Sequence, residues 1–214
     1  MNTWQIFFDN PGRRSLRWNH YFPIYDKHFS PWKNKSLTFF EIGVFDGGSG
    51  PLWSKYFGTM ATVVGIDINP DCKQYQTDYF QVRIGDQSDP TFLQSLIDEF
   101  GNPDCVLDDG SHKQSHIYKT FEFFYPNMHL NSVYMVEDLH CSYRTDYEGG
   151  LDLDTAFMNR TKNFIDQLNY RHCDDITLDP LMKDTFCVSC YDSVVVFEKG
   201  KVYKHGPIQS GCLK

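Results

Sequence analysis

Short apolar runs, rich in β-branched and aromatic residues, recur through the middle of the chain. Turn-forming residues or carboxylates bound each of them, which is typical of buried strands. We predict five such strands, at residues 37–44, 61–66, 80–84, 104–107 and 132–136.

Amphipathic segments separate these predicted strands. The clearest one follows Asp89 and Pro90 and has apolar residues at helical spacing, at Phe92, Leu93, Leu96, Ile97 and Phe100. Further helices are predicted at 52–57, from Asn69, from Ser111 and at 152–168. Strands that alternate with helices form a mostly parallel sheet with helices on both faces.

The last two predicted strands are related differently. Residues 185–191 and 193–198 are strand-like, and only Asp192 lies between them. Strands this close in sequence pair antiparallel, as a hairpin. We therefore expect an α/β protein whose mostly parallel, seven-stranded sheet ends in an antiparallel hairpin. Residues 1–36 are interpreted as an N-terminal cover segment, and 37–214 as the rest of a single domain.

The charge balance excludes some partners. With 20 Lys and Arg against 28 Asp and Glu, the chain has a formal net charge of −8. This argues against binding nucleic acid through its phosphates, and against docking on an anionic membrane by a basic patch. No apolar run reaches the roughly 20 residues of a membrane-spanning helix, and the N-terminus lacks the pattern of a signal peptide. These features predict a cytoplasmic protein.

The seven cysteines include a single C-x-x-C, formed by Cys187 and Cys190. No second pair completes a zinc site, so we interpret these two as reduced thiols in a strand. A redox or metal role remains the alternative.

Carboxylates mark the predicted parallel strands. In an open α/β sheet, ligands bind outside the carboxyl ends of the strands. The five strands carry acidic residues within them or at that end, namely Glu41, Asp67, Asp86, the pair Asp108 and Asp109, and the pair Glu137 and Asp138. Ordinary turn chemistry explains one or two of these but not the whole set. The sequence therefore predicts a charged site at this edge of the sheet.

The loop after the first strand carries a glycine motif. Glu41, Gly43 and Gly47 form E-x-G-x-x-x-G, which differs from the G-x-G-x-x-G of dinucleotide binders. This segment resembles motif I of the class I methyltransferases. The resemblance implies a Rossmann-like methyltransferase fold and S-adenosylmethionine as cofactor, with these three residues near its methionine part.

The same resemblance assigns further cofactor contacts. Asp67 follows the second strand, where the ribose diol lies, and a carboxylate can accept both hydroxyl hydrogens. Asp86 and Gln87 stand at the adenine position, and Asp108 is also counted among the cofactor-binding residues.

The ends of the fourth and fifth strands predict a metal site. Neighbouring residues in a strand face opposite ways, so Glu137 and Asp138 converge only if the strand ends there and the chain turns. With Asp109 they would form an all-carboxylate cluster, which repels itself unless it is protonated or binds a cation. Oxygen ligands select Mg²⁺ first, with Mn²⁺ or Ca²⁺ as the other candidates. His112 is the predicted catalytic base. His140 is a weaker candidate, for a contact with the substrate or with a neighbouring site residue.

The runs D-D-G-S-H at 108–112 and V-E-D-L-H-x-S-Y at 136–143 carry a closer resemblance. They are similar to the metal-dependent sugar O-methyltransferases of the mycinamicin and tetracenomycin type, and the similarity extends over residues 18–201. The resemblance implies a rhamnose-like or other vicinal-diol acceptor on a sugar-containing small molecule or glycan. It also implies Mg²⁺ on Asp109, Glu137 and Asp138, His112 as base, and a cover-segment tyrosine, Tyr21, that closes over the cofactor. A homo-oligomer is expected as well.

Three alternatives remain at this stage. The first is metal-dependent methylation of a catechol or another small diol. The second is a non-catalytic cofactor-binding or assembly protein. The third is an Fe(II) hydroxylase, which would need a triad such as His112, His140 and Asp109.

Overall fold

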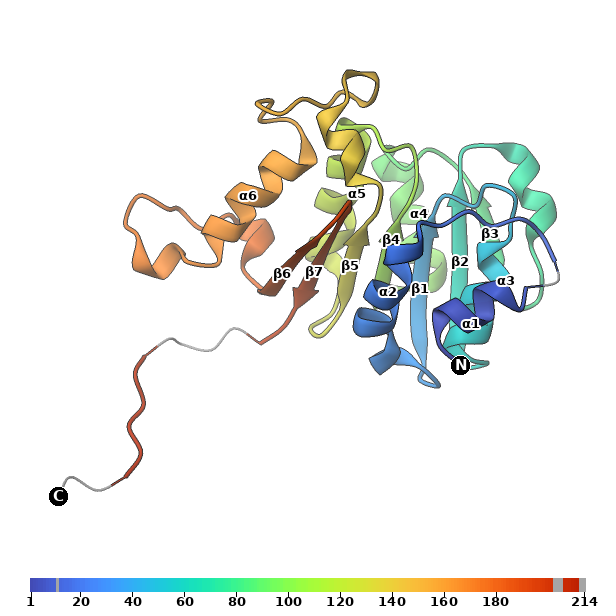
Figure 1. Ribbon diagram of the computed structural model, residues 1–214, viewed down its shortest axis with the longest axis horizontal. Coiled ribbons are helices and arrows are strands. Elements are labelled where there is room, and N and C mark those ends of the chain that lie inside the picture. Colours follow the sequence, from blue (N-terminus) through green and yellow to red (C-terminus); the bar gives the residue numbers. More distant parts are fainter. Residues whose placement is uncertain (11, 202–205, 212–214) are drawn as a thin grey trace.

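The protein is built on a seven-stranded sheet (Figure 1), seen in a computed structural model that describes residues 1–10, 12–201 and 206–211. The strands are β1 (Leu37–Ile42), β2 (Ala61–Asp67), β3 (Gln81–Ile84), β4 (Cys105–Asp108), β5 (Val133–Val136), β6 (Thr185–Tyr191) and β7 (Val194–Lys199). Their order is β3-β2-β1-β4-β5-β7-β6. The first five strands pair in parallel, whereas β7 is antiparallel to both β5 and β6. The predicted sheet and hairpin are confirmed.

The strand order fixes where a ligand can bind. From β1 the chain moves outward through β2 and β3 and then returns to β4 on the other side of β1. The connections after β1 and β4 therefore diverge, and a crevice opens at the carboxyl ends of these two strands.

Helices cover both faces of the sheet (Figure 1). The α-helices are α1 (Thr3–Phe8), α2 (Phe22–Phe29), α3 (Ser49–Phe57), α4 (Pro90–Phe100), α5 (Gln114–Asn127) and α6 (Phe157–Gln167). The first three pack in one hydrophobic cluster and the last three in the other. Short 3-10 helices complete the connections: η1 (Asn19–Tyr21), η2 (Ser30–Trp32), η3 (Pro70–Tyr75), η4 (Leu139–Tyr143), η5 (Thr145–Tyr147), η6 (Tyr170–His172) and η7 (Pro180–Met182).

The N-terminal residues are part of the core. Tyr25 and Phe29 of α2 contact Trp53 of α3, with ring centroids 5.2 and 5.7 Å apart. All three rings are fully buried and share a cluster with Phe39 of β1. Aromatic burial of this extent ties the predicted cover segment to the sheet.

Several element bounds differ from the prediction for local reasons. The helix expected from Ser111 begins at Gln114, because His112 has a left-handed backbone (φ 58°) that cannot continue a helix. The helix expected at 152–168 begins only at Phe157. The helix from Asn69 is the 3-10 helix η3, and the hairpin turn has two residues, since Ser193 also has a positive φ of 60°.

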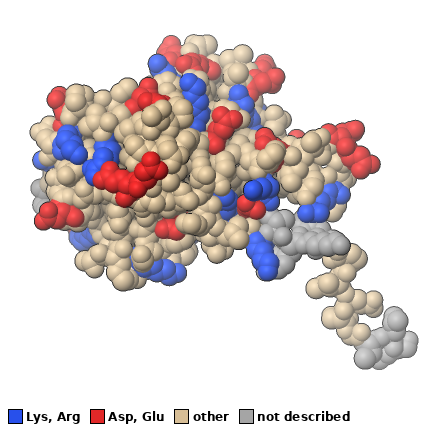
Figure 2. All heavy atoms as spheres, turned by 180° about the vertical axis from the view of Figure 1, so that it is seen from behind, with Lys and Arg blue, Asp and Glu red and all other residues tan. Residues whose placement is uncertain are grey.

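Neither the cysteines nor the surface charges indicate a further function. Six cysteines in the described part of the chain are free thiols, and Cys212 lies outside the described residues. On the face shown in Figure 2, acidic and basic side chains are interspersed. Within the described ranges, no helix has the length and apolar character needed to cross a membrane.

Candidate functional site

Two cavities open at the carboxyl edge of the sheet. The first has a volume of about 320 Å³, and its lining includes Gly43, Asp67, Asp86, Gln87 and Ser111. The second has a volume of about 400 Å³ and is lined by Leu16, Arg17, Trp18, Tyr21, Asp109, Glu137, Asp138 and His140. A small hollow of about 40 Å³ shares Gly43 with the first cavity and Asp109 with the second, so it lies between them.

Two carboxylates are fixed in the wall of the first cavity. Asp67 Oδ2 accepts hydrogen bonds from the backbone N–H groups of Val44 and Phe45 at 2.9 and 3.2 Å. Asp86 Oδ1 accepts one from the N–H of Ser88 at 2.7 Å, and this bond lowers the pKa of Asp86. Both carboxylates are therefore held in place by backbone groups.

Gln87 and Asp108 belong to an internal network. Gln87 Nε2 donates to Asp108 Oδ1 at 3.2 Å, and Gln87 Oε1 accepts from the N–H of Ser111 at 2.8 Å. The Tyr134 hydroxyl donates to Asp108 Oδ2, and burial raises the pKa of Asp108 to about 6. Asp108 ties β4 to the loop after β3, and its predicted contact with a cofactor stays a prediction.

Steric contacts within the chain require glycine at both motif positions. Gly43 has a φ of 99°, and a Cβ there would stand 2.1 Å from the carbonyl oxygen of Asp109. Gly47 has a φ of 76°, and its Cβ would stand 2.5 Å from the ring of Tyr75. Glycine is needed at both positions because neighbouring parts of this chain approach so closely.

Glu41 is fully buried in β1, below the cavities. Its carboxylate accepts hydrogen bonds from Ser49 Oγ at 2.6 Å, Trp53 Nε1 at 2.8 Å and Arg17 Nη2 at 2.6 Å. Burial raises the pKa of Glu41, and the charge of Arg17 opposes that rise. The carboxylate therefore has three partners within the protein. Its predicted contact with a cofactor stays a prediction.

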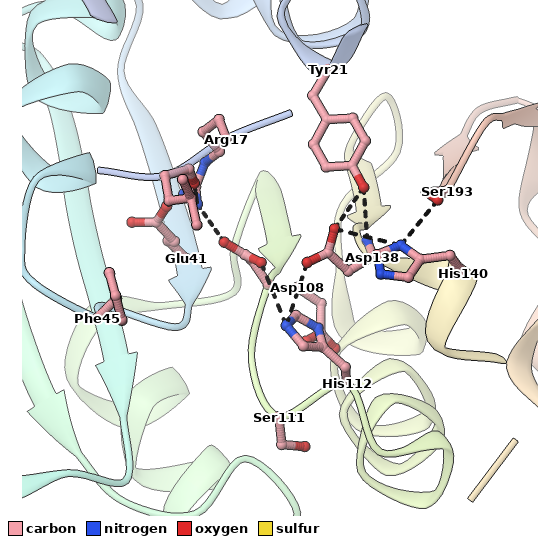
Figure 3. A network of polar contacts seen from close by, with 12 residues as sticks. Arg17, Tyr21, Glu41, Phe45, Asp108, Ser111, His112, Asp138, His140 and Ser193 are labelled. Atoms are coloured by element: carbon pink, nitrogen blue, oxygen red, sulfur yellow. Dashed lines mark hydrogen bonds and ion pairs between the residues drawn. The ribbon is translucent and has the colours of Figure 1, made fainter. Parts of the chain in front are cut away.

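Three of the predicted site residues come together beside the second cavity; Figure 3 shows two of them, His112 and Asp138, facing each other. His112 Nε2 lies 3.6 Å from Asp138 Oδ2 and 4.0 Å from Asp109 Oδ1. One donor atom from each of these three residues lies within 4.8 Å of the others. Burial and the negative charge of Asp138 raise the pKa of Asp109, while Arg17 and His112 oppose this. The three side chains can hold a cation, and the imidazole can accept a proton.

The backbone brings these side chains together. β5 ends at Val136, and Asp138 follows with a left-handed φ of 53°. His112 has a φ of 58°. L-residues adopt this region rarely and at a cost, and at these two positions it turns the chain so that both side chains face the same point. The turn expected after Glu137 is present, and both Glu137 and Asp138 line the second cavity.

Glu137 is the third predicted metal ligand, and it lies outside the close group of three. Its Oε1 is buried and makes no hydrogen bond of good geometry to a described residue, although the buried Tyr25 hydroxyl lies near enough to this carboxylate to oppose the rise in its pKa. Burial and the charge of Asp109 raise its pKa well above the usual range. A buried carboxylate oxygen without a partner, beside two further carboxylates, fits a bound hard cation.

Arg17, Trp18 and His140 also line the second cavity. No role was predicted for the first two, and His140 was only a candidate for a substrate contact. His140 Nδ1 lies 3.1 Å from Ser193 Oγ, and its ring centroid is 6.0 Å from that of Trp18. The close group of donors found in the described residues contains one histidine and two carboxylates. His140 lies outside this group, although its Nδ1 is 3.9 Å from Asp138 Oδ1. The described residues therefore do not bring His112, His140 and Asp109 together as the triad that an Fe(II) hydroxylase needs.

The strand order, the antiparallel β7 and the site at the carboxyl edge define the Rossmann-like fold of class I methyltransferases. A solved structure titled MycE methyltransferase from the mycinamycin biosynthetic pathway, in complex with Mg, SAH and mycinamycin VI, superposes with a TM-score of 0.83 at 24% identity. The match covers 94% of this chain and 54% of that one. The SAH-bound Podospora anserina methyltransferase PaMTH1 matches with a TM-score of 0.51 at 14% identity, over 93% of this chain and 88% of that one.

Curated sequences identify the nearer relationship: the chain is a relative of sugar O-methyltransferases of the tetracenomycin and macrolide type. The 8-demethyl-8-alpha-L-rhamnosyl tetracenomycin-C 2'-O-methyltransferase of Streptomyces olivaceus is 34% identical over 179 residues, covering 76% of this chain and 47% of the relative. The mycinamicin VI 2''-O-methyltransferase of Micromonospora griseorubida is 29% identical over 198 residues, covering 85% and 49%. The resemblance predicted from D-D-G-S-H is confirmed. The chain spans about half the length of these relatives, and no family model matches it.

Proposed function

We propose that this chain is a Mg²⁺-dependent O-methyltransferase that moves a methyl group from S-adenosylmethionine to a hydroxyl of a sugar. The observation that carries the proposal is the close approach of His112 to Asp109 and Asp138 at the edge of a methyltransferase fold. A base beside a cation site is the combination that methylation of an unactivated hydroxyl requires.

The first cavity is assigned to the adenosine part of the cofactor. Asp67 would accept hydrogen bonds from the ribose hydroxyls, and Asp86 and Gln87 would flank the adenine. The small hollow beside Gly43 is assigned to the methionine part. In this assignment the methionine part would lie between Gly43 and Asp109, next to the second cavity.

The second cavity is assigned to the cation and the acceptor. Asp109, Asp138 and Glu137 would hold Mg²⁺, with Mn²⁺ or Ca²⁺ as the other candidates. When bound, the cofactor supplies a methyl group on a positively charged sulfur, and the cation lowers the pKa of two neighbouring acceptor hydroxyls and orients them.

His112 is assigned as the general base. Its Nε2 would take the hydroxyl proton, and Asp138 Oδ2 at 3.6 Å would stabilise the imidazolium that forms. Tyr21 would close over this centre, because its hydroxyl already reaches Asp138. Trp18 and His140 would line the acceptor side of the cavity.

The acceptor class rests on the relatives, one of which is named for an α-L-rhamnosyl substrate. We propose a rhamnose-like sugar or another vicinal diol on a small molecule or glycan. A catechol or other small diol remains the alternative acceptor, since the same cation would bind it. The homo-oligomer, the absence of a nucleic-acid partner and the cytoplasmic location stay predictions.

The test replaces His112 with Ala and, separately, removes the cation with a chelator. Methyl transfer to a panel of rhamnosides, other vicinal-diol glycosides and catechols should fall by about 10²- to 10⁴-fold in the variant and vanish with the chelator. Calorimetric S-adenosylmethionine binding should persist in His112→Ala, and His129→Ala, an exposed histidine at the opposite edge of the sheet, serves as control. Undiminished transfer in either case contradicts the mechanism, and failure of the wild-type protein to bind the cofactor supports the non-catalytic alternative.

A further inference from the structure

The guanidinium of Arg17 connects the cover segment with two strands of the sheet. Nη1 lies 2.5 Å from Asp109 Oδ2, and Nη2 lies 2.6 Å from Glu41 Oε1. The Arg17 side chain is only 9% exposed, although it comes from the irregular segment between α1 and η1. The largely buried guanidinium therefore holds one fully buried carboxylate of β1, Glu41, and one partly exposed carboxylate of the loop after β4, Asp109.

The two oxygens of Asp109 have different partners. Oδ2 accepts the hydrogen bond from Arg17, and Oδ1 is the oxygen that lies 4.0 Å from His112 Nε2. The guanidinium of Arg17 thus lies on the Oδ2 side of the Asp109 carboxylate, and Oδ1, on the side toward His112, stays available to an ion. Arg17 and a bound ion can share Asp109 without competing for the same oxygen.

Asp138 repeats this arrangement (Figure 3). Its Oδ1 accepts a hydrogen bond of 2.6 Å from the Tyr21 hydroxyl, and its Oδ2 lies 3.6 Å from His112 Nε2. Residues 17 and 21 of one short segment therefore each hold one oxygen of a carboxylate and leave the other toward the same point.

The geometry of an arginine suits this task. A planar guanidinium offers donors in a fixed fork, whereas a lysine ammonium is a point charge on a flexible stem. Without the fork, Glu41 would be buried without a counter-charge, and the Asp109 side chain would lose the hydrogen bond that orients it.

We propose that Arg17 is a positioning residue that fixes Asp109 for ion binding and thereby couples the order of residues 12–21 to the ion. The inference rests on the cation site of the proposed function and names the residue that assembles it. Ion binding would hold the segment closed, and the closed segment would hold the ligands.

The test measures the affinity for Mn²⁺ alone, by the loss of the free-ion electron paramagnetic resonance signal. We expect Arg17→Met to bind Mn²⁺ at least about tenfold more weakly than the wild-type protein, as for loss of a charge-assisted hydrogen bond. Arg83→Met is the matched control, because Arg83 also forks onto a carboxylate, Glu99, but on β3 and α4. Equal or tighter binding by Arg17→Met overturns the inference.

A second variant and a second measurement distinguish a loss of positioning from a folding defect in Arg17→Met. Arg17→Lys keeps the charge but not the fork, so it should also bind Mn²⁺ more weakly, and wild-type affinity in this variant overturns the inference. In the wild-type protein, Mn²⁺ should slow tryptic cleavage after Arg17 severalfold, while cleavage at an unchanged rate counts against the coupling. Failure of the wild-type protein to bind Mn²⁺ at all contradicts the cation site itself, which separates the two proposals.

Discussion

The Tyr21 hydroxyl lies 2.6 Å from Oδ1 of Asp138, a residue 117 positions further along the chain. Burial and this hydrogen bond raise the pKa of Tyr21 far above its usual value. The phenol therefore stays protonated and donates throughout the ordinary pH range. A residue of the cover segment thus restrains a carboxylate at the end of β5.

Tyr21→Phe should weaken the cation site while the fold persists. Loss of a hydrogen bond to a charged group costs about 1.5–3 kcal/mol, which predicts about 10- to 150-fold weaker Mn²⁺ binding and a similar fall in turnover. Titration with Mn²⁺ and steady-state methyl transfer check this. Tyr79→Phe, an exposed tyrosine before β3, is the control. Wild-type affinity in Tyr21→Phe would mean that Asp138 needs no such restraint.

Glycine should be better tolerated than alanine at position 112. The left-handed backbone of His112 (φ 58°) disfavours any residue with a Cβ. We expect His112→Gly to be more stable than His112→Ala by about 1 kcal/mol, measured by urea unfolding. At Glu122, an exposed position inside α5, the order should reverse by a similar amount. The same order at both positions would contradict the strain at His112.

Trp53 should stabilise the fold through its ring nitrogen as well as its bulk. Its Nε1 donates to the buried Glu41 at 2.8 Å, and the ring is fully buried. Trp53→Phe should lower the free energy of unfolding by about 2–3 kcal/mol, because a buried carboxylate loses a donor. Trp4→Phe, at a tryptophan that is 42% exposed, should cost less than about 1 kcal/mol. Equal losses in the two variants would refute this role.

The stabilisation that Glu198 provides should be lost in acid. His28 Nδ1 lies 2.9 Å from Glu198 Oε1, and this hydrogen bond lowers the pKa of Glu198. A lowered pKa contributes stability above the unfolded value and loses it as the pH falls through the folded value. The difference in unfolding free energy between wild type and Glu198→Gln should therefore shrink between about pH 5 and pH 3. A difference that grows toward acid would contradict the sign.

Sequence reasoning could find the residues at the strand ends because the sheet itself gathers them. The carboxyl ends of parallel strands lie at one edge, so Asp109, Asp138 and His112 converge once β4 and β5 are neighbours. The turn at Asp138 was predictable as well, since two adjacent strand residues cannot face the same way.

Arg17 was out of reach of the same reasoning. It lies 92 positions before Asp109, in a segment with no helical or strand periodicity. Its partner follows from tertiary packing, and no local pattern encodes that. The glycine motif was predicted only in part. Gly43 was expected to let the backbone approach a cofactor, and the structure adds a second reason for glycine, since a Cβ there would clash with the Asp109 carbonyl oxygen.

The hairpin turn between β6 and β7 contacts His140, which lines the second cavity. Ser193 Oγ lies 3.1 Å from His140 Nδ1, and the Ser193 carbonyl accepts a hydrogen bond from the N–H of Leu139. Turns at the tip of a rigid scaffold accept insertions and exchanges readily. Substitutions at Ser193 would therefore change the surroundings of His140, and through it the pocket proposed for the acceptor, from a two-residue turn that lies outside the ladder of β6 and β7.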